Sequence, residues 1–252
     1  MIQGLYAAAT GMMALEDRHS VIANNIANSA TVGFKRQNPI SKGFKEVFLG
    51  EMGTATQLNA ERGPGGGLKV LATYTDLQSG GIITTDDPLN IALTGPGFIG
   101  VETPDGERFT RNGTFIVDLD GQLATPDGYK IQSSGGGPLD VGEGKVTIDD
   151  TGQVSVDGQV AGQIRLVEFA EPRLLEQAGS NLYFASEAVA AQATDAEDTR
   201  VVSGALESSN VQAPVEMAEM LLGLRAYEAN QKVITTVDET VGRLINDVGS
   251  PA

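Results

Sequence analysis

Few residues in this chain could do chemistry, and the first of them is a single histidine. His19 lies in an apolar-striped segment that is predicted to be helical, and the chain has no cysteine. A Ser-His-Asp or Cys-His arrangement would have to recruit this one imidazole from the interior of a helix. We therefore expect a packed or capped histidine and no catalytic residues.

Two short motifs resemble ligand-binding loops but lack the residues that the chemistry requires. Asp118-Leu119-Asp120-Gly121 begins like a calcium loop, yet Leu123 and Tyr129 occupy the positions where an EF-hand needs its glycine and its last glutamate. The glycines of residues 63–69 resemble a phosphate loop, but no Gly-Lys-Ser/Thr follows. We expect a hairpin turn at the first motif, a flexible link at the second, and no metal or cofactor at either.

Charge and composition argue against several classes of protein. The formal net charge of −16 does not suit a nucleic-acid or anionic-membrane binder, because phosphates need a basic surface. The acidic residues are scattered through predicted turns and indicate a solvated surface. The N-terminus lacks a basic stretch followed by an apolar core, so no cleaved signal peptide is predicted. No uninterrupted apolar run reaches the length of about 18 residues that spans a bilayer.

The elements that dominate the chain are two predicted helices at its ends. From Met217 to Val248 a 3,4 alternation of mostly apolar residues continues for about four heptads, which predicts a helix of roughly 50 Å with one seam to bury. Pro214 suits its first turn, and Gly249 ends it. Residues 5–26 repeat the same spacing, with alanines that allow close helix packing.

Two such helices alone form a thin unit with part of the longer seam uncovered. We therefore expect them to pair as a coiled coil and to complete their core against neighbouring copies in an assembly. The alternative is an ordinary intramolecular hairpin of helices that caps a β domain. Asn24, Asn25 and Asn28 suggest amide hydrogen bonds across a contact, although a helix that frays into a polar loop would also contain them.

Between the helices the pattern changes twice. Residues 33–70 are predicted to be an extended linker, because prolines and glycines block regular structure. Their basic segment, 35–45, could pair with an acidic face of another copy or be a solvated loop. Residues 71–206 contain short alternating strands separated by pairs that occupy tight hairpin turns: Asp105-Gly106, Asn112-Gly113, Asp120-Gly121, Asp127-Gly128 and Asp157-Gly158. The fold class is therefore α+β, with a terminal helical domain (1–32 with 207–252) and a central antiparallel β domain, a small barrel or sandwich.

Motifs at both ends and in the middle carry a resemblance to a known family. Ile22-Ala23-Asn24-Asn25-Ile26-Ala27-Asn28, continuing through Thr31-Val32-Gly33-Phe34-Lys35, resembles the N-terminal motif of bacterial flagellar basal-body rod and hook proteins. The stretches that resemble the family's C-terminal motif and central domain are 206–211, 216–217, 225–230, 95–99 and 111–115.

The resemblance implies a structural subunit of the flagellar rod that is not an enzyme and has no cofactor. Its terminal helices would form the inner coiled-coil layer of a helical tube that transmits torque, with the β domain outside. The implied partners are its own copies, other rod and hook-basal-body subunits and the flagellar export apparatus, with no nucleic acid and no small-molecule substrate. The implied location is the periplasm-spanning rod of the basal body, reached without a cleaved signal peptide.

The seams and motifs together define an expected assembly interface. Its residues are Leu5, Met12, Leu15, Ile22, Asn24, Asn25, Ile26, Asn28, Gly33, Phe34, Asn210, Val211, Met217, Leu221, Leu224, Arg225, Tyr227, Asn230, Ile234 and Val241.

The resemblance leaves the member of the family open. Taking the segment between Phe34 and Leu77 as shorter than in the distal rod protein, we favour the proximal rod protein, with the distal one next. The hook protein of the family is longer because of additional outer β domains, for which 252 residues leave no room. Two other classes are kept as alternatives. One is a carbohydrate-binding or enzymatic β protein with helical arms, which would show a concave polar pocket in residues 70–205. The other is an adhesin-like fibre whose termini merely dimerise.

Overall fold

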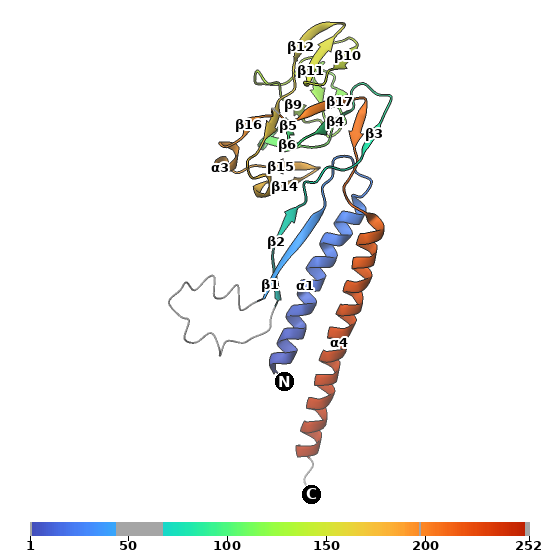
Figure 1. The fold of residues 1–252 in the computed structure, drawn as a ribbon. Helices are drawn as coiled ribbons and strands as arrows, with labels where there is room; N and C mark the ends of the chain where they lie inside the picture. The colour runs from blue at the N-terminus through green and yellow to red at the C-terminus, as the bar shows by residue number, and fades with distance from the viewer. Residues whose placement is uncertain (1, 44–67, 197, 250–252) are drawn as a thin grey trace. The chain divides into compact units, whose positions relative to one another are not determined.

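The structure, a computed structural model, describes residues 2–43, 68–196 and 198–249. The chain forms two compact units, whose elements are shown in Figure 1. The helical unit comprises residues 1–27, 37–74 and 212–252, and the β unit comprises residues 28–36 and 75–211. Long helices lie at the two ends of the chain and strands between them, so the expected α+β class is confirmed.

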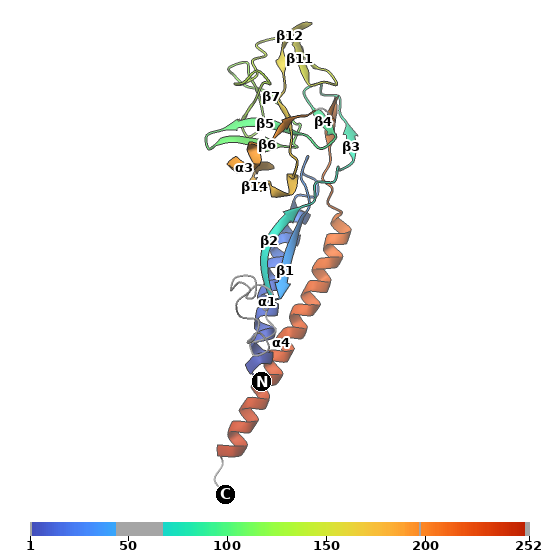
Figure 2. The same ribbon diagram turned by 60° about the vertical axis from the view of Figure 1, so that its left-hand side comes forward.

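Two long helices and a pair of strands make up the helical unit. α1 spans Ile2–Ala27 and α4 spans Ala213–Gly249, and the two lie side by side and antiparallel in both ribbon views (Figures 1 and 2). Pro214 occupies the first turn of α4, where a helix does not use the backbone N–H. β1 (Gln37–Gly43) pairs with β2 (Leu68–Thr75) and packs against α1.

Contacts at two levels fix the register of the helices. Asn25 Nδ2 donates a hydrogen bond to Glu216 Oε2 (3.2 Å). Gly11 lies so close to Asn230 that a Cβ on the glycine would be 3.3 Å from the asparagine Nδ2. Because both helices rise equally per residue, the start of α1 lies beside about residue 239 of α4. The C-terminal turns of α4 therefore extend beyond α1, as Figure 1 shows.

The β unit is built from short strands and two short helical segments. The strands are β3 (Ile82–Thr84), β4 (Ile91–Thr94), β5 (Phe98–Thr103), β6 (Gly106–Thr110), β7 (Ile116–Val117), β8 (Leu123–Ala124), β9 (Lys130–Ile131), β10 (Val146–Ile148), β11 (Gln153–Val156), β12 (Gln159–Gln163), β13 (Leu166–Glu168), β14 (Glu176–Gly179), β15 (Leu182–Phe184), β16 (Thr194–Asp195), β17 (Arg200–Ser203) and β18 (Ala205–Glu207). The helical segments are η2 (Pro172–Leu174) and α3 (Glu187–Ala190).

The strands of the β unit pair in an antiparallel manner. The largest sheet has nine strands, in the order β14-β15-β6-β5-β9-β8-β7, with β13 added on β5 and β16 on β13. β10, β11 and β12 form a three-stranded sheet, β17 pairs with β4, and β18 pairs with β3. The central antiparallel β region expected from the turn pairs is thus confirmed.

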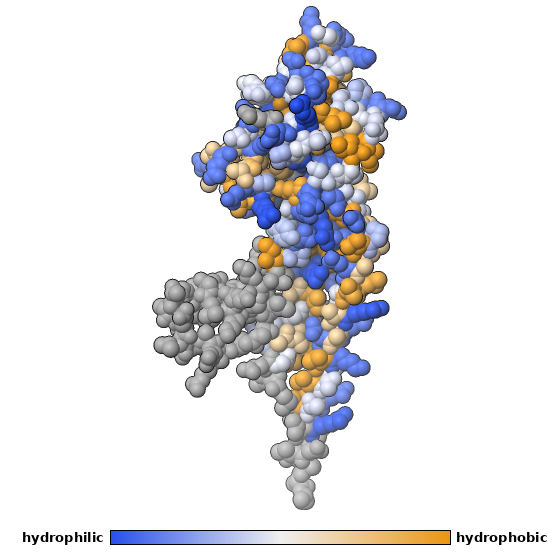
Figure 3. Space-filling model, in the orientation of Figure 1, coloured by the Kyte–Doolittle hydropathy of each residue, from blue (hydrophilic) through white to orange (hydrophobic). Residues whose placement is uncertain are grey.

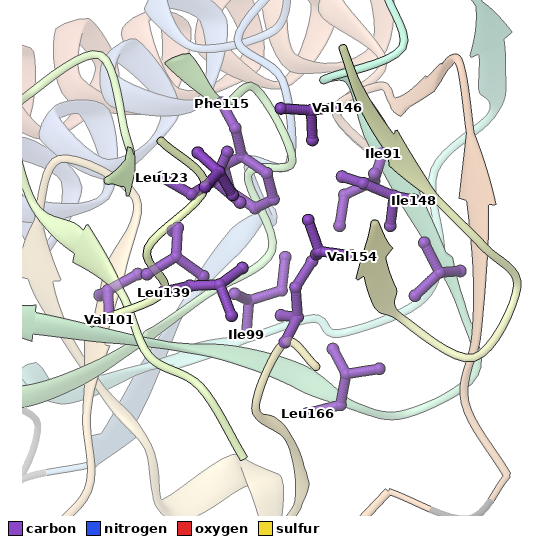
Figure 4. Close-up of a cluster of buried hydrophobic side chains, with 14 of the residues drawn as sticks. Ile91, Ile99, Val101, Phe115, Leu123, Leu139, Val146, Ile148, Val154 and Leu166 are labelled. Carbon is purple, nitrogen blue, oxygen red and sulfur yellow. The ribbon is translucent and has the colours of Figure 1, made fainter. Parts of the chain in front are cut away.

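Apolar side chains from several strands meet in the main core of the β unit (Figure 4). Ile91 of β4, Ile99 of β5, Val154 of β11 and Leu166 of β13 are among the buried residues that form it. In β10 the buried Val146 and Ile148 flank the exposed Thr147, and in β11 the buried Val154 lies between two half-buried residues, as the two-residue period of a strand requires. The core therefore follows directly from the alternating pattern of the sequence.

A second, aromatic cluster lies on the other side of β5. Phe98 makes edge-to-face contacts with Phe169 and Tyr183, with ring centroids 5.8 and 5.5 Å apart. Phe109 contacts Phe169 in the same geometry. The two clusters take alternate residues of β5, Phe98 in one and Ile99 in the other, so both faces of this strand are covered.

Four of the five predicted turn glycines occupy hairpin turns with positive φ. They are Gly106, Gly121, Gly128 and Gly158. The fifth prediction is wrong, because Gly113 does not lie in a hairpin turn. A Cβ at Gly113 would be 1.8 Å from the backbone oxygen of Ile91. Glycine is required there because two chain segments approach each other closely.

The two units divide the chain differently from the domains expected from the sequence. Residues 28–32 and 207–211, expected with the terminal helices, belong to the β unit. The expected linker 33–70 contains β1, and its end starts β2, while 44–67 lie outside the described residues. The reason is local: Gly33, at φ 68°, turns the chain after α1, and its N–H donates to Glu207 O (2.8 Å).

Candidate assembly surfaces

The long helix α4 has apolar side chains on more than the face that contacts α1. Glu216, Gly223, Asn230, Ile234 and Val241 lie on its contact face and are buried or half-buried. On one flank of that face are Met217, Leu221 and Leu224, which fall within about 60° of each other at 100° per residue. All three are exposed, Leu221 to 61%.

A second apolar flank lies on the opposite side of the contact face. Val215, Leu222 and Val233 share this side of α4, and all three are exposed, Leu222 to 65%. Figure 3 shows apolar residues along the described length of the helix. A surface helix of a globular protein has one apolar stripe, so a helix with two further apolar flanks has surface left to bury.

The contact face of α1 is formed largely by small residues. Ala8, Gly11 and Ala14 are buried, and with Ile22 they make up most of the enclosed side of the helix. The predicted stripe is turned partly away from this side, because its members Met12 and Leu15 are only half-buried. Small side chains allow α4 and β1 to approach the α1 backbone closely.

The expected interface residues fall into three groups. The buried ones are Ile22, Asn25, Gly33, Phe34 and Val211. The half-buried ones are Met12, Leu15, Ile26, Asn28, Asn210, Asn230, Ile234 and Val241. The exposed ones are Leu5, Asn24, Met217, Leu221, Leu224, Arg225 and Tyr227. Only the exposed residues, together with the solvent-facing sides of the half-buried residues, present a surface to another subunit.

Asn25 connects three elements of the helical unit. Its Oδ1 accepts a hydrogen bond from the Gln37 N–H (3.0 Å), and its Nδ2 donates to Gln37 O (2.9 Å) and to Glu216 Oε2 (3.2 Å). The amide therefore joins α1 to the start of β1 and to the first turn of α4. This side chain makes the hydrogen bonds across a contact that the asparagine cluster predicts, whereas Asn28 Oδ1 accepts from Thr31 Oγ1 in the turn after α1.

Asn210 makes the corresponding connection within the β unit. Its Oδ1 accepts from the Arg36 N–H (2.7 Å), and its Nδ2 donates to Asp76 O (2.9 Å) and Gln78 O (3.1 Å). The Asp76 N–H also donates to Arg36 O. Three chain segments that are far apart in sequence are thus held by one amide. The N- and C-terminal motifs meet here.

The strongest electrostatic feature of the β unit is a buried ion pair between these motifs. Lys35 Nζ donates to Glu207 Oε1 (2.5 Å), and both side chains are fully enclosed. The Lys35 ammonium also donates to Gln78 O, and Glu207 Oε1 accepts from the Gly80 N–H. Burial lowers the pKa of Lys35, and the Glu207 carboxylate opposes this change.

Arg111 adds a second cation beside the same carboxylate. Its Nη1 is 3.6 Å from Glu207 Oε2, and its guanidinium lies over the ring of Phe98 at 4.9 Å. Burial is the main cause that lowers the pKa of Arg111. The neighbouring Tyr183 hydroxyl is also enclosed, and burial raises its pKa well above the usual value.

The sequence patterns do not predict this cluster, because they place Lys35 in a solvated or subunit-facing basic segment. That prediction is wrong for Lys35, which is fully buried. A signal was present, since Lys35, Arg111 and Glu207 each lie inside a different one of the motifs singled out in the sequence. Charged residues of opposite sign that lie in separate motifs of one chain can therefore be examined as possible ion-pair partners.

The described residues contain little that could do chemistry. The His19 ring lies against α4, where a Cβ on Gly223 would be 2.9 Å from its Nε2, so it is packed as expected. Asp118 to Gly121 form the turn between β7 and β8, as expected. In the part of the chain that the structure describes, no group of three His, Cys, Asp or Glu could hold a metal ion. No described helix is both long and apolar enough to cross a bilayer.

Three family models match the chain in the order of its motifs. The model "Flagella basal body rod protein" matches residues 5–35, and "Flagellar hook protein FlgE/F/G D1 domain" matches residues 92–159. The model "Flagellar basal body rod FlgEFG protein C-terminal" matches residues 202–247. The matches at the two ends contain most of α1 and α4, and the middle match contains most of β4 and all of β5 to β11.

Whole-length relatives carry names from the same family. The chain is 33% identical to the flagellar basal-body rod protein FlgG of Bacillus subtilis, over 98% of this chain and 99% of that protein. It is 36% identical to FlgG of Caulobacter vibrioides, over 94% and 96% of the two chains. It is also 29% identical to the flagellar hook-basal body complex protein FlhO of Bacillus subtilis. The chain therefore belongs to the flagellar basal-body rod protein family and is a structural subunit of the rod in the basal body.

Proposed function

We propose that the chain polymerises through α1 and α4 into the torque-transmitting shaft of the rod. The observation that carries this proposal is the pair of exposed apolar flanks on α4, one with Leu221 and one with Leu222. Full burial of a leucine contributes about 1.5–3 kcal/mol relative to an exposed one. A helix with an apolar flank on each side favours one further helix on each side.

The geometry of that assembly follows from the two flanks. Because they lie on different sides of α4, the surface that a subunit presents to one neighbour differs from the surface that it presents to the next. Such a heterologous contact forms a ring if its rotation closes and a helical filament if it does not, and we propose the filament. In this tube the helices pair as coiled coils in the inner layer, with the β units, closed as a small barrel or sandwich, outside.

A shaft needs rigid packing and no reaction site, so we propose that the chain is not an enzyme. The packing of His19 against α4 and the names of the relatives support this. We also propose that the subunit reaches the rod through the flagellar export apparatus, without a cleaved signal peptide. Its partners are its own copies and the neighbouring rod and hook-basal-body subunits.

The assembly proposal is tested by polar substitutions on the two flanks. Leu221→Gln and Leu222→Gln, made singly and together, should leave the melting of the purified monomer unchanged, because both side chains already contact water. In cells they should reduce incorporation into basal bodies and motility, the double variant most. Lys232→Gln, an exposed polar change on the same helix, is the control. Normal rods from the double variant would refute the proposal.

Position along the rod is a separate question, and we keep the proximal location as the proposal. It rests on the length of the segment between Phe34 and Leu77. Gold labelling of a tagged chain in purified basal bodies measures the position directly. Label at the membrane end of the rod supports the proximal location, and label next to the hook supports the distal one.

A further inference from the structure

The turn between β7 and β8 presents an apolar side chain to solvent. Leu119 is fully exposed, at 104%. Backbone hydrogen bonds hold the turn, from the Gly121 N–H to Asp118 O (3.0 Å) and from the Asp118 N–H to Gln122 O (2.8 Å). Aspartate and glycine favour turns through their own hydrogen bonds and conformations, whereas a leucine side chain adds nothing to a turn. The fold therefore gives no reason for a leucine at this position.

The strand that leads into this turn extends the apolar surface. Ile116 and Val117 form β7, and both side chains are exposed. β7 is the last strand at one end of the nine-stranded sheet, so in the described sheet it is paired on one side only. Apolar residues that gather on an exposed sheet edge favour contact with another protein surface.

An open pocket of the β unit has apolar walls. Its volume is about 270 Å³. Leu77, Pro96 and Pro172 supply the walls, and the rest of the lining comes from Gln78, Ser79, Gly95 and Arg111. Ligand sites for drug-sized molecules typically have about 300–1,000 Å³. A pocket below this range suits a single side chain.

We propose that Leu119 of one copy inserts into this pocket of the next copy. The leucine is fully exposed, so it does not fill the pocket of its own chain. A rigid turn that already holds the side chain outward loses little conformational freedom when it docks. The contact rests on the polymerisation proposed above, and it adds a connection between β units to the one between helices.

The charges around the two surfaces are complementary. Asp118 and Asp120 flank the leucine, and Asp120 makes only an exposed ion pair with Lys130, at 3.9 Å. None of the residues that line the pocket is acidic, and its one charged lining residue is Arg111. Two carboxylates beside the inserted leucine therefore meet a surface whose charge is positive, which favours this orientation of the contact.

The contact joins two different places on the β unit. β7 lies at one end of the nine-stranded sheet. Pro172, in the pocket wall, belongs to η2, which leads into β14 at the other end of the same sheet. A protrusion and a pocket at different sites make a heterologous contact, which passes from each copy to the next in one direction. This agrees with the unlike flanks of α4.

The test is a disulfide cross-link in assembled rods, which is free of background because the chain has no cysteine. Leu119→Cys and Ser79→Cys are made in two separate copies with tags of different length. Both are expressed together with the parent chain, so that rods form in every strain. Isolated basal bodies are oxidised with copper phenanthroline. Val160→Cys, an exposed apolar position on β12, replaces Leu119→Cys in the control.

The Leu119 pair should give roughly ten times more mixed dimer than the Val160 pair, because a disulfide needs Cα atoms within about 4.4–6.8 Å. Equal yields, or no mixed dimer in rods that contain both copies, would overturn the contact. Since the parent chain builds these rods, that failure would leave polymerisation through the helices untouched. Normal rods from the double Leu221 and Leu222 variant, with the mixed dimer present, would overturn only the helical contact.

A second measurement compares entry into the same mixed rods. Leu119→Gln should be incorporated roughly ten times less often than the parent chain, because it places a polar group against apolar walls. Val160→Gln should enter as often as the parent, and both variants should melt like the parent because both positions are exposed. Equal entry of Leu119→Gln and the parent would overturn the proposal. Reduced entry without the cross-link would assign Leu119 to a different partner and overturn the pocket as its site.

Discussion

Lys35 Nζ and Glu207 Oε1 lie 2.5 Å apart in the interior of the β unit, although 172 residues separate them in the chain. Lys35 follows α1 closely in the chain and Glu207 precedes α4, so the ion pair connects the first and last segments of the β unit. Gly33 N–H donates to the backbone oxygen of the same glutamate. The ion pair and this backbone bond therefore hold one junction.

The first prediction concerns this ion pair. Lys35→Met leaves the Glu207 carboxylate buried without its closest cation, and it should destabilise the β unit by about 3–5 kcal/mol in urea unfolding. Arg200→Met is the matched control, because Arg200 and Asp150 form an exposed pair and the change should cost at most about 1 kcal/mol. Equal effects of the two substitutions would contradict the role given to Lys35.

The second prediction uses two adjacent glycines next to the same junction. A Cβ at Gly80 would be 1.8 Å from the backbone oxygen of Ser208, whereas a Cβ at Gly81 would meet only the Ser208 Oγ, at 3.3 Å. Gly80→Ala should therefore cost about 1–3 kcal/mol or more, and Gly81→Ala clearly less, because at 3.3 Å the Ser208 side chain needs to move only slightly. Thermal unfolding of the two variants side by side gives the comparison.

The third prediction concerns the contact between the helices. Gly223→Ala would place a methyl group 2.9 Å from His19 Nε2, so it should lower the stability of the helical unit despite the better helix propensity of alanine. Gly242→Ala meets nothing within 4 Å and should raise helix stability by up to about 1 kcal/mol. Helical circular dichroism during melting distinguishes the two, and the same sign for both would refute the packing argument.

The fourth prediction concerns pH. Burial raises the pKa of the Tyr183 hydroxyl above the usual value of 10. Above pH 10 the folded state therefore binds a proton that the unfolded state has released, and stability that is complete below pH 10 is lost as pH rises. The loss from this group approaches about 1.4 kcal/mol per pH unit.

Tyr183→Phe isolates this effect. The hydroxyl has no hydrogen-bond partner among the described residues, so its removal should change stability little at pH 8. Between pH 10 and 11, urea unfolding should show the parent losing stability relative to Tyr183→Phe. Parallel pH profiles for the two proteins would mean that the hydroxyl is not enclosed in solution.

Particular residues show which features of the structure could be predicted from the sequence alone and which could not. The helices and most turns were predictable because their signals are local, as with the 3,4 spacing of α4 and the Asp-Gly pairs at Gly106 and Gly158. Gly113 was mistaken for a turn, because the backbone of Ile91 that requires a glycine there is remote in sequence. Lys35 was mistaken for a surface charge for the same reason, since its partner lies near the other end of the chain.

The faces of α4 illustrate the same limit. The apolar stripe was predictable, but the choice of contact face was not, because it depends on which residues of α1 are small enough to admit a second helix. The small residues Gly11 and Ala14 are buried on the side of α1 that admits α4, and with this contact face Met217, Leu221 and Leu224 remain exposed. For this reason the predicted interface contains both intramolecular contacts and outward-facing residues.

The unequal lengths of α1 and α4 have a mechanical meaning. Where α4 runs on past the start of α1, its backbone has no sister helix from its own chain, so a subunit has one end that is doubled and one that is single. In the assembly that we propose, this single end would overlap the helices of the next subunit, so a torque would cross each junction between subunits on a continuous helix. The same overlap would give the proposed rod a direction of growth, because its two ends would offer different surfaces to an arriving copy.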